Sequence, residues 1–217
     1  MSYSLVDNNG VYHETKLDKL FNKKENGFFI ELGAHDGLTQ SNTAFLEKTR
    51  NWTGVLIEPS VNNYQKCIKN REKSIVVNCA CVSNEYKEEF VKGDFSENSL
   101  MSSVGGKRRR RGNKCNVKAR TLENILDEHL KKNNIDFLSL DTEGYELNIL
   151  KGLNLQKYKP SYMLIEIYNF DYENILKYLN DFNYELVCNF SGYNKKDNPG
   201  WDGTHNDYLF KYKYKLY

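Results

Sequence analysis

The chain has 217 residues, and its 31 Lys and Arg against 29 Asp and Glu give a formal net charge of +2 at pH 7. Hydrophobic residues make up 39% and charged residues 28%, as in an ordinary globular protein, which excludes collagen-like, low-complexity and polycationic chains. No uncharged apolar stretch approaches the roughly 18 residues of a membrane span, and the first residues lack the basic and apolar regions of a secretory signal.

Apolar runs alternate with amphipathic stretches along the chain. The apolar runs predict strands at residues 27–33, 52–58, 74–82, 135–140 and 162–168, and a terminal strand pair at 184–190 and 207–214. Helices are predicted at 12–21, 42–49, 62–70, 121–132, 146–150 and 172–179. This alternation indicates an α/β fold with a mostly parallel sheet and helices on both faces. The terminal pair, with no long helix between its strands, predicts an antiparallel edge.

No repeat or linker divides the chain, so we expect a single domain over residues 1–217. Residues 1–26 would form a helical N-terminal extension, and residues 105–114 a basic loop. The five cysteines are odd in number and include no CxxC pair, so neither a disulfide framework nor a structural zinc site is expected. A reducing, cytoplasmic compartment fits this cysteine usage.

The first predicted strand ends in a glycine-rich turn, Gly33-Ala34-His35-Asp36-Gly37. A strand followed by such a turn and a helix is a nucleotide-binding geometry. The dinucleotide fingerprint would also require glycine at positions 35 and 38, which hold His and Leu here. The second glycine lets the backbone approach a pyrophosphate, so His35 argues against NAD.

Acidic residues gather at the predicted strand ends, namely Glu31, Asp36, Asp141 and Glu143. They would repel phosphates and attract a cationic ligand, most strongly in a partly desolvated cleft. S-adenosylmethionine carries a sulfonium and an ammonium and no phosphate, so it fits this charge. Glu58 closes the second strand, where a carboxylate can accept two hydrogen bonds from ribose hydroxyls.

These segments resemble the FkbM-type S-adenosylmethionine-dependent methyltransferases. The matching segments, in the family's order, are FFIELGAHDGLTQSNTAFLE (28–47), WTGVLIEPS (52–60), NCACVS (78–83), KARTLENIL (118–126), FLSLDTEGYELNILKGL (137–153) and YMLIEIYN (162–169). The resemblance implies a Rossmann-like methyltransferase fold with a seven-stranded sheet and a reversed last strand. It also implies O-methylation, commonly of sugars in glycans or of small metabolites.

The resemblance further implies where the cofactor lies. The turn at 33–37 would wrap the methionine part, Glu58 would hold the ribose, and segment 78–81 would lie along the adenine. By the same resemblance, Ser41 and Asn42, at the start of the next helix, would make further contacts with the cofactor. The predicted cofactor-binding residues are Glu31, Gly33, Ala34, His35, Asp36, Gly37, Ser41, Asn42, Glu58, Pro59, Cys79, Ala80 and Asp141.

Methyl transfer is an in-line displacement that depends on alignment, and a sugar hydroxyl also needs a base at neutral pH. Asp141, Glu143 and His205 are the predicted catalytic residues. Asp141 is the first choice for the base because its strand end should lie nearest the methyl group. It would alternatively hold the cofactor amine or cap the following helix. The same three side chains suit a divalent cation such as Mg²⁺ or Mn²⁺, although no spacing requires one.

Substrate contacts are predicted at Glu166, Arg109 and Arg110. Glu166 interrupts an apolar strand, where an unpaired carboxylate costs several kcal/mol, so it should meet a cation or line the cleft. The two arginines belong to the basic run 107–111, which would be a solvated loop, an anion-capturing loop or an RNA contact.

We therefore expect an S-adenosylmethionine-dependent O-methyltransferase whose acceptor is a hydroxyl of a sugar, a glycan or a small metabolite. One alternative is an RNA 2′-O-methyltransferase that uses the basic loop. The other is a catalytically degenerate binding module of the same fold, against which the glycines and acids at the strand ends argue.

Overall fold

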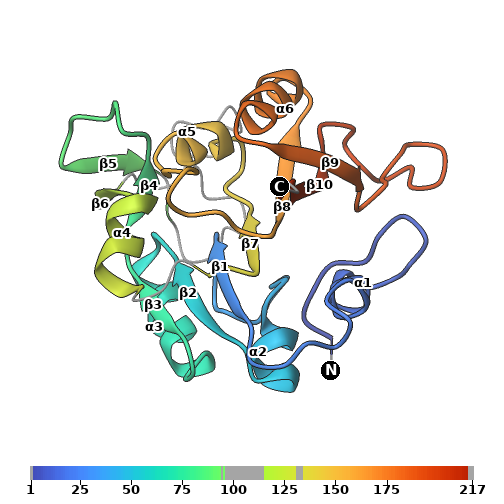
Figure 1. The fold of residues 1–217 in the computed structure, drawn as a ribbon, viewed down its shortest axis with the longest axis horizontal. Coiled ribbons are helices and arrows are strands. Elements are labelled where there is room, and N and C mark those ends of the chain that lie inside the picture. Colours follow the sequence, from blue (N-terminus) through green and yellow to red (C-terminus); the bar gives the residue numbers. More distant parts are fainter. Residues whose placement is uncertain (1, 94, 96–114, 131–133, 215–217) are drawn as a thin grey trace.

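The computed structural model describes residues 2–93, 95, 115–130 and 134–214. Its main sheet has seven strands (Figure 1), in the spatial order β3 (Ile75–Val77), β2 (Thr53–Ile57), β1 (Phe28–Leu32), β7 (Phe137–Leu140), β8 (Tyr162–Tyr168), β10 (His205–Tyr212) and β9 (Tyr184–Asn189). The first five strands pair in parallel, and β10 runs antiparallel to both β8 and β9. This arrangement confirms the predicted fold class.

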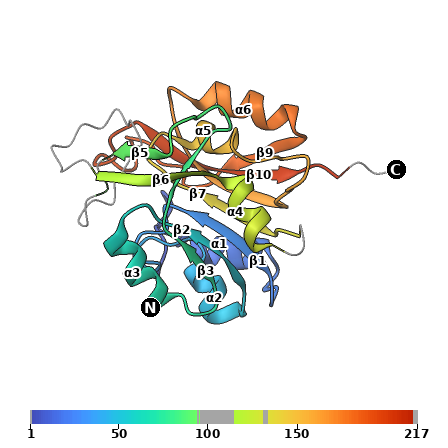
Figure 2. The ribbon, with the colours of Figure 1, turned by 90° about the vertical axis from the view of Figure 1, so that its left-hand side faces the viewer.

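Helices cover both faces of this sheet (Figure 2). One apolar cluster joins the sheet to α4 (Leu122–His129), α5 (Glu146–Leu150) and α6 (Tyr172–Asp181), and a second joins it to α1 (His13–Leu20), α2 (Ala44–Arg50) and α3 (Val61–Asn70). Side chains alternate across a strand, so in β1 Ile30 packs in the first cluster and Phe29 in the second. Burial on both faces explains why β1, β2 and β7 are apolar runs.

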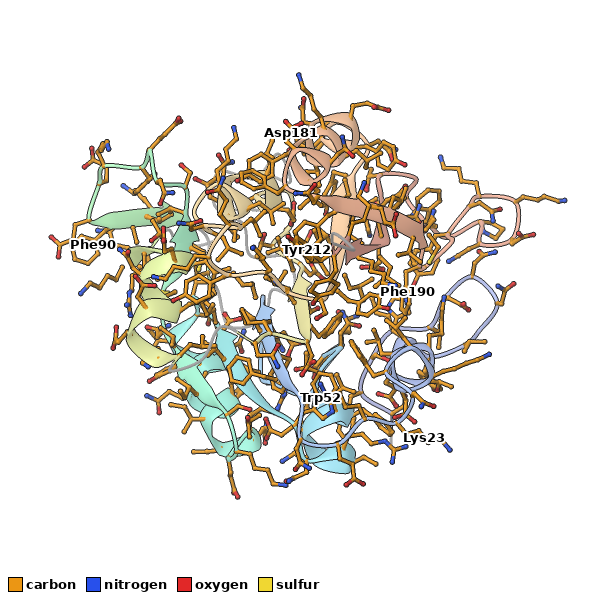
Figure 3. The ribbon with its side chains drawn as sticks, in the orientation of Figure 1. Lys23, Trp52, Phe90, Asp181, Phe190 and Tyr212 are labelled. Atoms are coloured by element: carbon orange, nitrogen blue, oxygen red, sulfur yellow. The ribbon has the colours of Figure 1, made fainter. Side chains whose placement is uncertain are left out.

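Aromatic packing holds the start of β1 against β2. Trp52 lies beside α2, just before β2 (Figure 3), and is fully buried. Its indole Nε1 donates a hydrogen bond to the Lys24 carbonyl at 2.7 Å, and its ring meets Phe21 edge-on at 4.9 Å between centroids. A Cβ at Gly27 would lie 2.4 Å from the Trp52 ring, so glycine is required there. This packing fixes the starts of β1 and β2 relative to each other. The carboxyl ends of the same two strands build the site.

The predicted strand at 74–82 is in fact two strands in two sheets. β3 ends at Val77, and the chain leaves the main sheet. The next strand, β4 (Ala80–Val82), belongs to a smaller sheet of order β4-β6-β5 with β5 (Phe90–Gly93) and β6 (Cys115–Thr121). Asn78 marks the break, because its Nδ2 donates to the Glu58 and Pro59 carbonyls at 2.8 and 3.0 Å. β6 was not predicted because most of its residues are polar and at least partly exposed.

The terminal strand pair forms the predicted antiparallel edge of the sheet. β10 lies inside the sheet, between β8 and β9, and β9 forms the edge. The pattern of alternation indicates antiparallel pairing but carries no information about which strand of the pair inserts. None of the helices in the described residues combines the length and the apolar character that a bilayer crossing requires.

Candidate active site

The turn after β1 packs closely against the ends of β2 and β7. Gly33 N and Ala34 N each donate a hydrogen bond to the Ile57 carbonyl at 3.2 Å. Gly33 has φ +80°, and a Cβ at this position would lie 1.9 Å from the Asp141 carbonyl oxygen. Both the conformation and the close approach therefore require glycine.

Glu58 follows β2 and faces this turn. Its two carboxylate oxygens accept hydrogen bonds from His35 N and Ser60 N, each at 2.8 Å. Burial raises the pKa of Glu58 to about 7, even though the two N–H groups favour the ionised form. Each oxygen retains accepting capacity, so the pair can receive two neighbouring hydroxyls.

A pocket opens where the main strands end, with an empty volume of about 790 Å³ that includes its mouth. It lies between the ends of β1 and β7, where the strand order reverses, which is where open α/β sheets bind ligands. Eight of the predicted cofactor-binding or catalytic residues line it, namely Gly33, His35, Glu58, Pro59, Cys79, Ala80, Asp141 and Glu143. The wall also includes residues that were not predicted, among them Thr39, Gln40, Cys81, Phe95 and Tyr145.

The donor set of this pocket fits S-adenosylmethionine. The glycine turn provides a cradle that a side chain at position 33 would fill. Glu58 suits the ribose diol, and the apolar wall beside Cys79 and Ala80 suits the adenine. Asp141 and Glu143 suit the cationic end. The same acids would repel the phosphates of NAD or ATP.

The remaining predicted cofactor residues of this turn lie behind the wall of the pocket. Glu31 is buried and accepts hydrogen bonds from Ser41 Oγ, Asn42 N and Thr43 Oγ1. Arg71 Nη1 lies 3.3 Å from Glu31 Oε2. These contacts shape the turn from behind. A direct cofactor contact by Glu31, Ser41 or Asn42 stays a prediction.

Asp36 closes the turn itself. Its carboxylate accepts hydrogen bonds from Leu38 N at 2.9 Å and Thr39 N at 2.7 Å. Burial opposes ionisation, but these N–H groups and the Thr39 hydroxyl keep the pKa of Asp36 below its ordinary value. Ala34 and Gly37 also lie outside the pocket wall, and their predicted cofactor contacts, like that of Asp36, stay predictions.

A second turn, Asp141-Thr142-Glu143-Gly144, follows β7 and is held by a residue that sequence reasoning missed. Glu146 is almost fully buried, and its Oε1 accepts hydrogen bonds from Thr142 N at 2.8 Å and Gly144 N at 3.1 Å. An acid at the first position of the following helix is the available signal for such a contact. The turn brings Glu143 into left-handed φ, +59°, beside Asp141.

Three predicted acids converge at this turn. Asp141, Glu143 and Glu166 each offer one carboxylate oxygen, and these oxygens all lie within 4.8 Å of one another. We call these three residues the acid cluster. Tyr168 donates its hydroxyl to Glu143 Oε2 at 2.6 Å. The sequence placed Asp141 and Glu143 in one turn, and the tertiary structure brings Glu166 to them.

Electrostatics within the acid cluster favours the neutral carboxyl forms. Burial, followed by the negative charges of Glu143 and Asp207, raises the pKa of Asp141. Burial and the charges of Asp141 and Glu143 likewise raise the pKa of Glu166. Carboxylates held this close repel one another unless a proton or a cation compensates.

His205 reaches the acid cluster from β10. Its Nε2 lies 3.2 Å from Glu166 Oε1, and its Nδ1 lies 2.9 Å from Thr204 Oγ1. Tyr168 lies beside it, with ring centroids 5.1 Å apart, and Phe170 follows at 5.6 Å from Tyr168. Phe170 is 49% exposed. Two aromatic rings, those of Tyr168 and Phe170, therefore follow His205 beside the acid cluster.

The predicted arginine contacts, Arg109 and Arg110, lie outside the described residues, as does the whole basic run 107–111. Anion capture or RNA binding by this run stays a prediction.

Comparisons with known proteins agree with this geometry. The model of the methyltransferase FkbM domain matches residues 31–186. A search of curated proteins found no match. Among solved structures, the METTL16 methyltransferase domain is similar with a TM-score of 0.53 and 12% identity, over 94% of this chain and 67% of that one.

Two further solved structures share the fold. The human methyltransferase 10 domain containing protein has a TM-score of 0.50 and 14% identity, over 94% of this chain and 81% of that one. Aeropyrum pernix fibrillarin, solved with natively bound S-adenosyl-L-methionine, has a TM-score of 0.50 and 13% identity, over 87% and 67%. With the FkbM match over most of its length and a pocket suited to the methyl donor, the chain belongs to the FkbM family of S-adenosylmethionine-dependent methyltransferases.

Proposed function

We propose that this methyltransferase transfers the methyl group to a hydroxyl of a sugar, a glycan or a small polyhydroxylated metabolite. The observation that carries the proposal is the double position of Asp141. It lines the donor pocket and is also a member of the acid cluster. A hydroxyl bound at the acid cluster would therefore lie next to the donor's methyl group, as in-line transfer requires.

The cofactor supplies an electrophilic methyl group on a sulfonium sulfur. The chain's own residues would hold it, with Glu58 at the ribose and the turn at Gly33 around the methionine part. Asp141 would accept the proton of the acceptor hydroxyl. Its raised pKa makes it a stronger base than an ordinary aspartate, which suits a weakly acidic hydroxyl. His205, in contact with Glu166, is the second candidate for the base.

The surroundings of the acid cluster favour a polyhydroxylated acceptor. Carboxylates accept hydrogen bonds from neighbouring hydroxyls, and Asp141 and Glu143 both line the pocket. Among the described residues that line the pocket there is no Lys or Arg to neutralise the phosphates of an acceptor such as RNA. These features support the sugar or metabolite over the RNA 2′-hydroxyl.

The test is a transfer assay with radiolabelled S-adenosylmethionine over monosaccharides, glycans, small hydroxylated metabolites and RNA. We expect label on a sugar or metabolite hydroxyl. Asp141→Asn should lower kcat by about 10²–10⁴-fold, the usual contribution of a general base. His205→Asn, assayed in parallel, tests the second base. Label on RNA alone would contradict the proposal, and so would S-adenosylhomocysteine binding without any transfer.

A further inference from the structure

We propose that the acid cluster, Asp141, Glu143 and Glu166, binds one divalent cation of the Mg²⁺ or Mn²⁺ type. The cation's part in catalysis rests on the proposed function, but its binding does not. Three oxygens that share one cation cannot lie farther apart than twice the metal–oxygen distance. That limit is about 4.2 Å for Mg²⁺ and about 5 Å for Ca²⁺. The observed spread, within 4.8 Å, needs only a small contraction around the smaller ion.

A second observation points to a ligand that the protein itself does not provide. Glu166 is 8% exposed, and its Oε2 is buried with no hydrogen-bond partner in the described part of the chain. Its Oε1 faces His205, which is charged only when protonated. Within the described residues, no Lys or Arg forms an ion pair with Asp141 or Glu166. A buried carboxylate left in this state is costly, and a cation would remove the cost.

The donor chemistry selects the class of cation. The cluster offers carboxylate oxygens, which suit Mg²⁺, Mn²⁺ and Ca²⁺ rather than the thiolate-preferring metals. The imidazole of His205 lies beside the cluster, and an adjacent nitrogen donor favours Mn²⁺ over Ca²⁺. Glu166 is carried by β8, whereas Asp141 and Glu143 both lie in the turn that follows β7, the strand paired with β8.

Such a cation would orient two neighbouring hydroxyls of the acceptor and lower the pKa of the bound one. Asp141 would take up the proton of the acceptor hydroxyl as its O–H bond breaks. The acceptor oxygen would bond to the methyl carbon as the C–S bond breaks, and the donor would leave as S-adenosylhomocysteine with that electron pair on sulfur. Atoms and charges balance without any further reactant.

The experiment is a titration of the full chain, stripped with EDTA and dialysed, with MnCl₂ in the presence of S-adenosylhomocysteine. Free Mn²⁺ is followed by electron paramagnetic resonance. We expect one Mn²⁺ per chain, displaced by excess MgCl₂. Glu166→Gln and Glu143→Gln should each weaken Mn²⁺ binding by at least about tenfold. Glu185→Gln is the matched control, because Glu185 lies opposite Lys211 in the register of β9 and β10, at the end of the strands away from the acid cluster. This variant should bind Mn²⁺ as the wild type does.

A measurement on the wild-type chain guards against a variant that fails to fold. In a proton NMR spectrum, substoichiometric Mn²⁺ should broaden the ring signals of His205 while those of His129, at the end of α4, remain sharp. Absence of stoichiometric binding, or equal broadening of both histidines, would overturn the cation site. Unchanged transfer in EDTA would overturn the cation's catalytic part and leave the proposed function standing. A bound cation without transfer to any hydroxyl would overturn the proposed function alone.

Discussion

Gly33 is the residue on which the geometry of the donor pocket depends most directly. Gly33→Ala should lose S-adenosylhomocysteine binding, because its Cβ would lie 1.9 Å from the Asp141 carbonyl oxygen. The matched control is Gly10→Ala, where φ is also left-handed, +76°, but nothing lies within 4 Å of the added Cβ. The free energy of unfolding of the control should fall only by the conformational penalty of about 1–2 kcal/mol. Calorimetric titration and urea unfolding of both variants check this, and equal effects would refute the steric argument.

Glu58 makes a prediction about pH. Its pKa of about 7 in the free protein means that half of the chains carry a neutral Glu58 near neutrality. If the ionised form accepts the ribose hydroxyls, protonation opposes binding. The affinity for S-adenosylhomocysteine should then fall about tenfold from pH 8 to pH 6.

Glu58→Gln provides the control for this pH dependence. The variant should bind more weakly at pH 8, by about 1–3 kcal/mol, because a neutral amide replaces a charged acceptor. It should also lose most of the pH dependence. Calorimetry at several pH values distinguishes the cases, and a wild-type pH profile in the variant would remove Glu58 from the ribose role.

At the scale of elements, one buried arginine joins the glycine turn to two helices. Arg71, directly after α3, is fully buried. Its guanidinium donates to the Gly37 carbonyl and to Thr43 Oγ1, and it pairs with Glu31 at 3.3 Å and Glu47 at 3.0 Å. The turn that lines the donor pocket is therefore supported by α2 and α3 through this one side chain.

Removal of this arginine should be costly. Arg71→Met leaves Glu31 and Glu47 buried without their cation, so the free energy of unfolding should fall by about 3–5 kcal/mol, and the donor affinity should fall with it. The control is Arg120→Met, which breaks the exposed pair with Glu128 and should leave stability little changed. Denaturant unfolding of both variants is the measurement. Equal stability losses would show that the buried network does not support the turn.

At the scale of the whole molecule, the sheet topology determines which ligands stabilise the fold. The pocket lies at the carboxyl ends of β1, β2 and β7, so a bound donor joins three strands and the turns that follow them. S-adenosylhomocysteine at a hundredfold its Kd should add about 2.7 kcal/mol, which corresponds to a rise in Tm of about 5–11 °C for a domain of this size. NAD should give no shift, because no Lys or Arg among the described pocket residues would neutralise its phosphates. Thermal unfolding followed by fluorescence checks both, and stabilisation by NAD would contradict the charge argument.

The strands and helices that alternate in burial were predictable from local pattern alone. An apolar run such as 135–140 can bury itself only inside a covered sheet, and so it became β7. The small sheet was not predictable, because β6 carries exposed polar residues whose pairing with β4 and β5 depends on distant segments. For the same reason the break at Asn78 was missed, since its hydrogen-bond acceptors lie on residues 58 and 59.

For the site, the sequence by itself determined the chemical types and their placement at strand ends. Glycine at 33, the acid at 58 and the acids after β7 follow from conformational freedom and charge, which are local properties. Only the tertiary structure decided which acids face the ligand. It turned Glu31 inward to Arg71, and it brought Glu166 of β8 within 4.8 Å of Asp141 and Glu143. The reason is that side-chain direction depends on strand register and on partners far along the chain, and no local pattern encodes either.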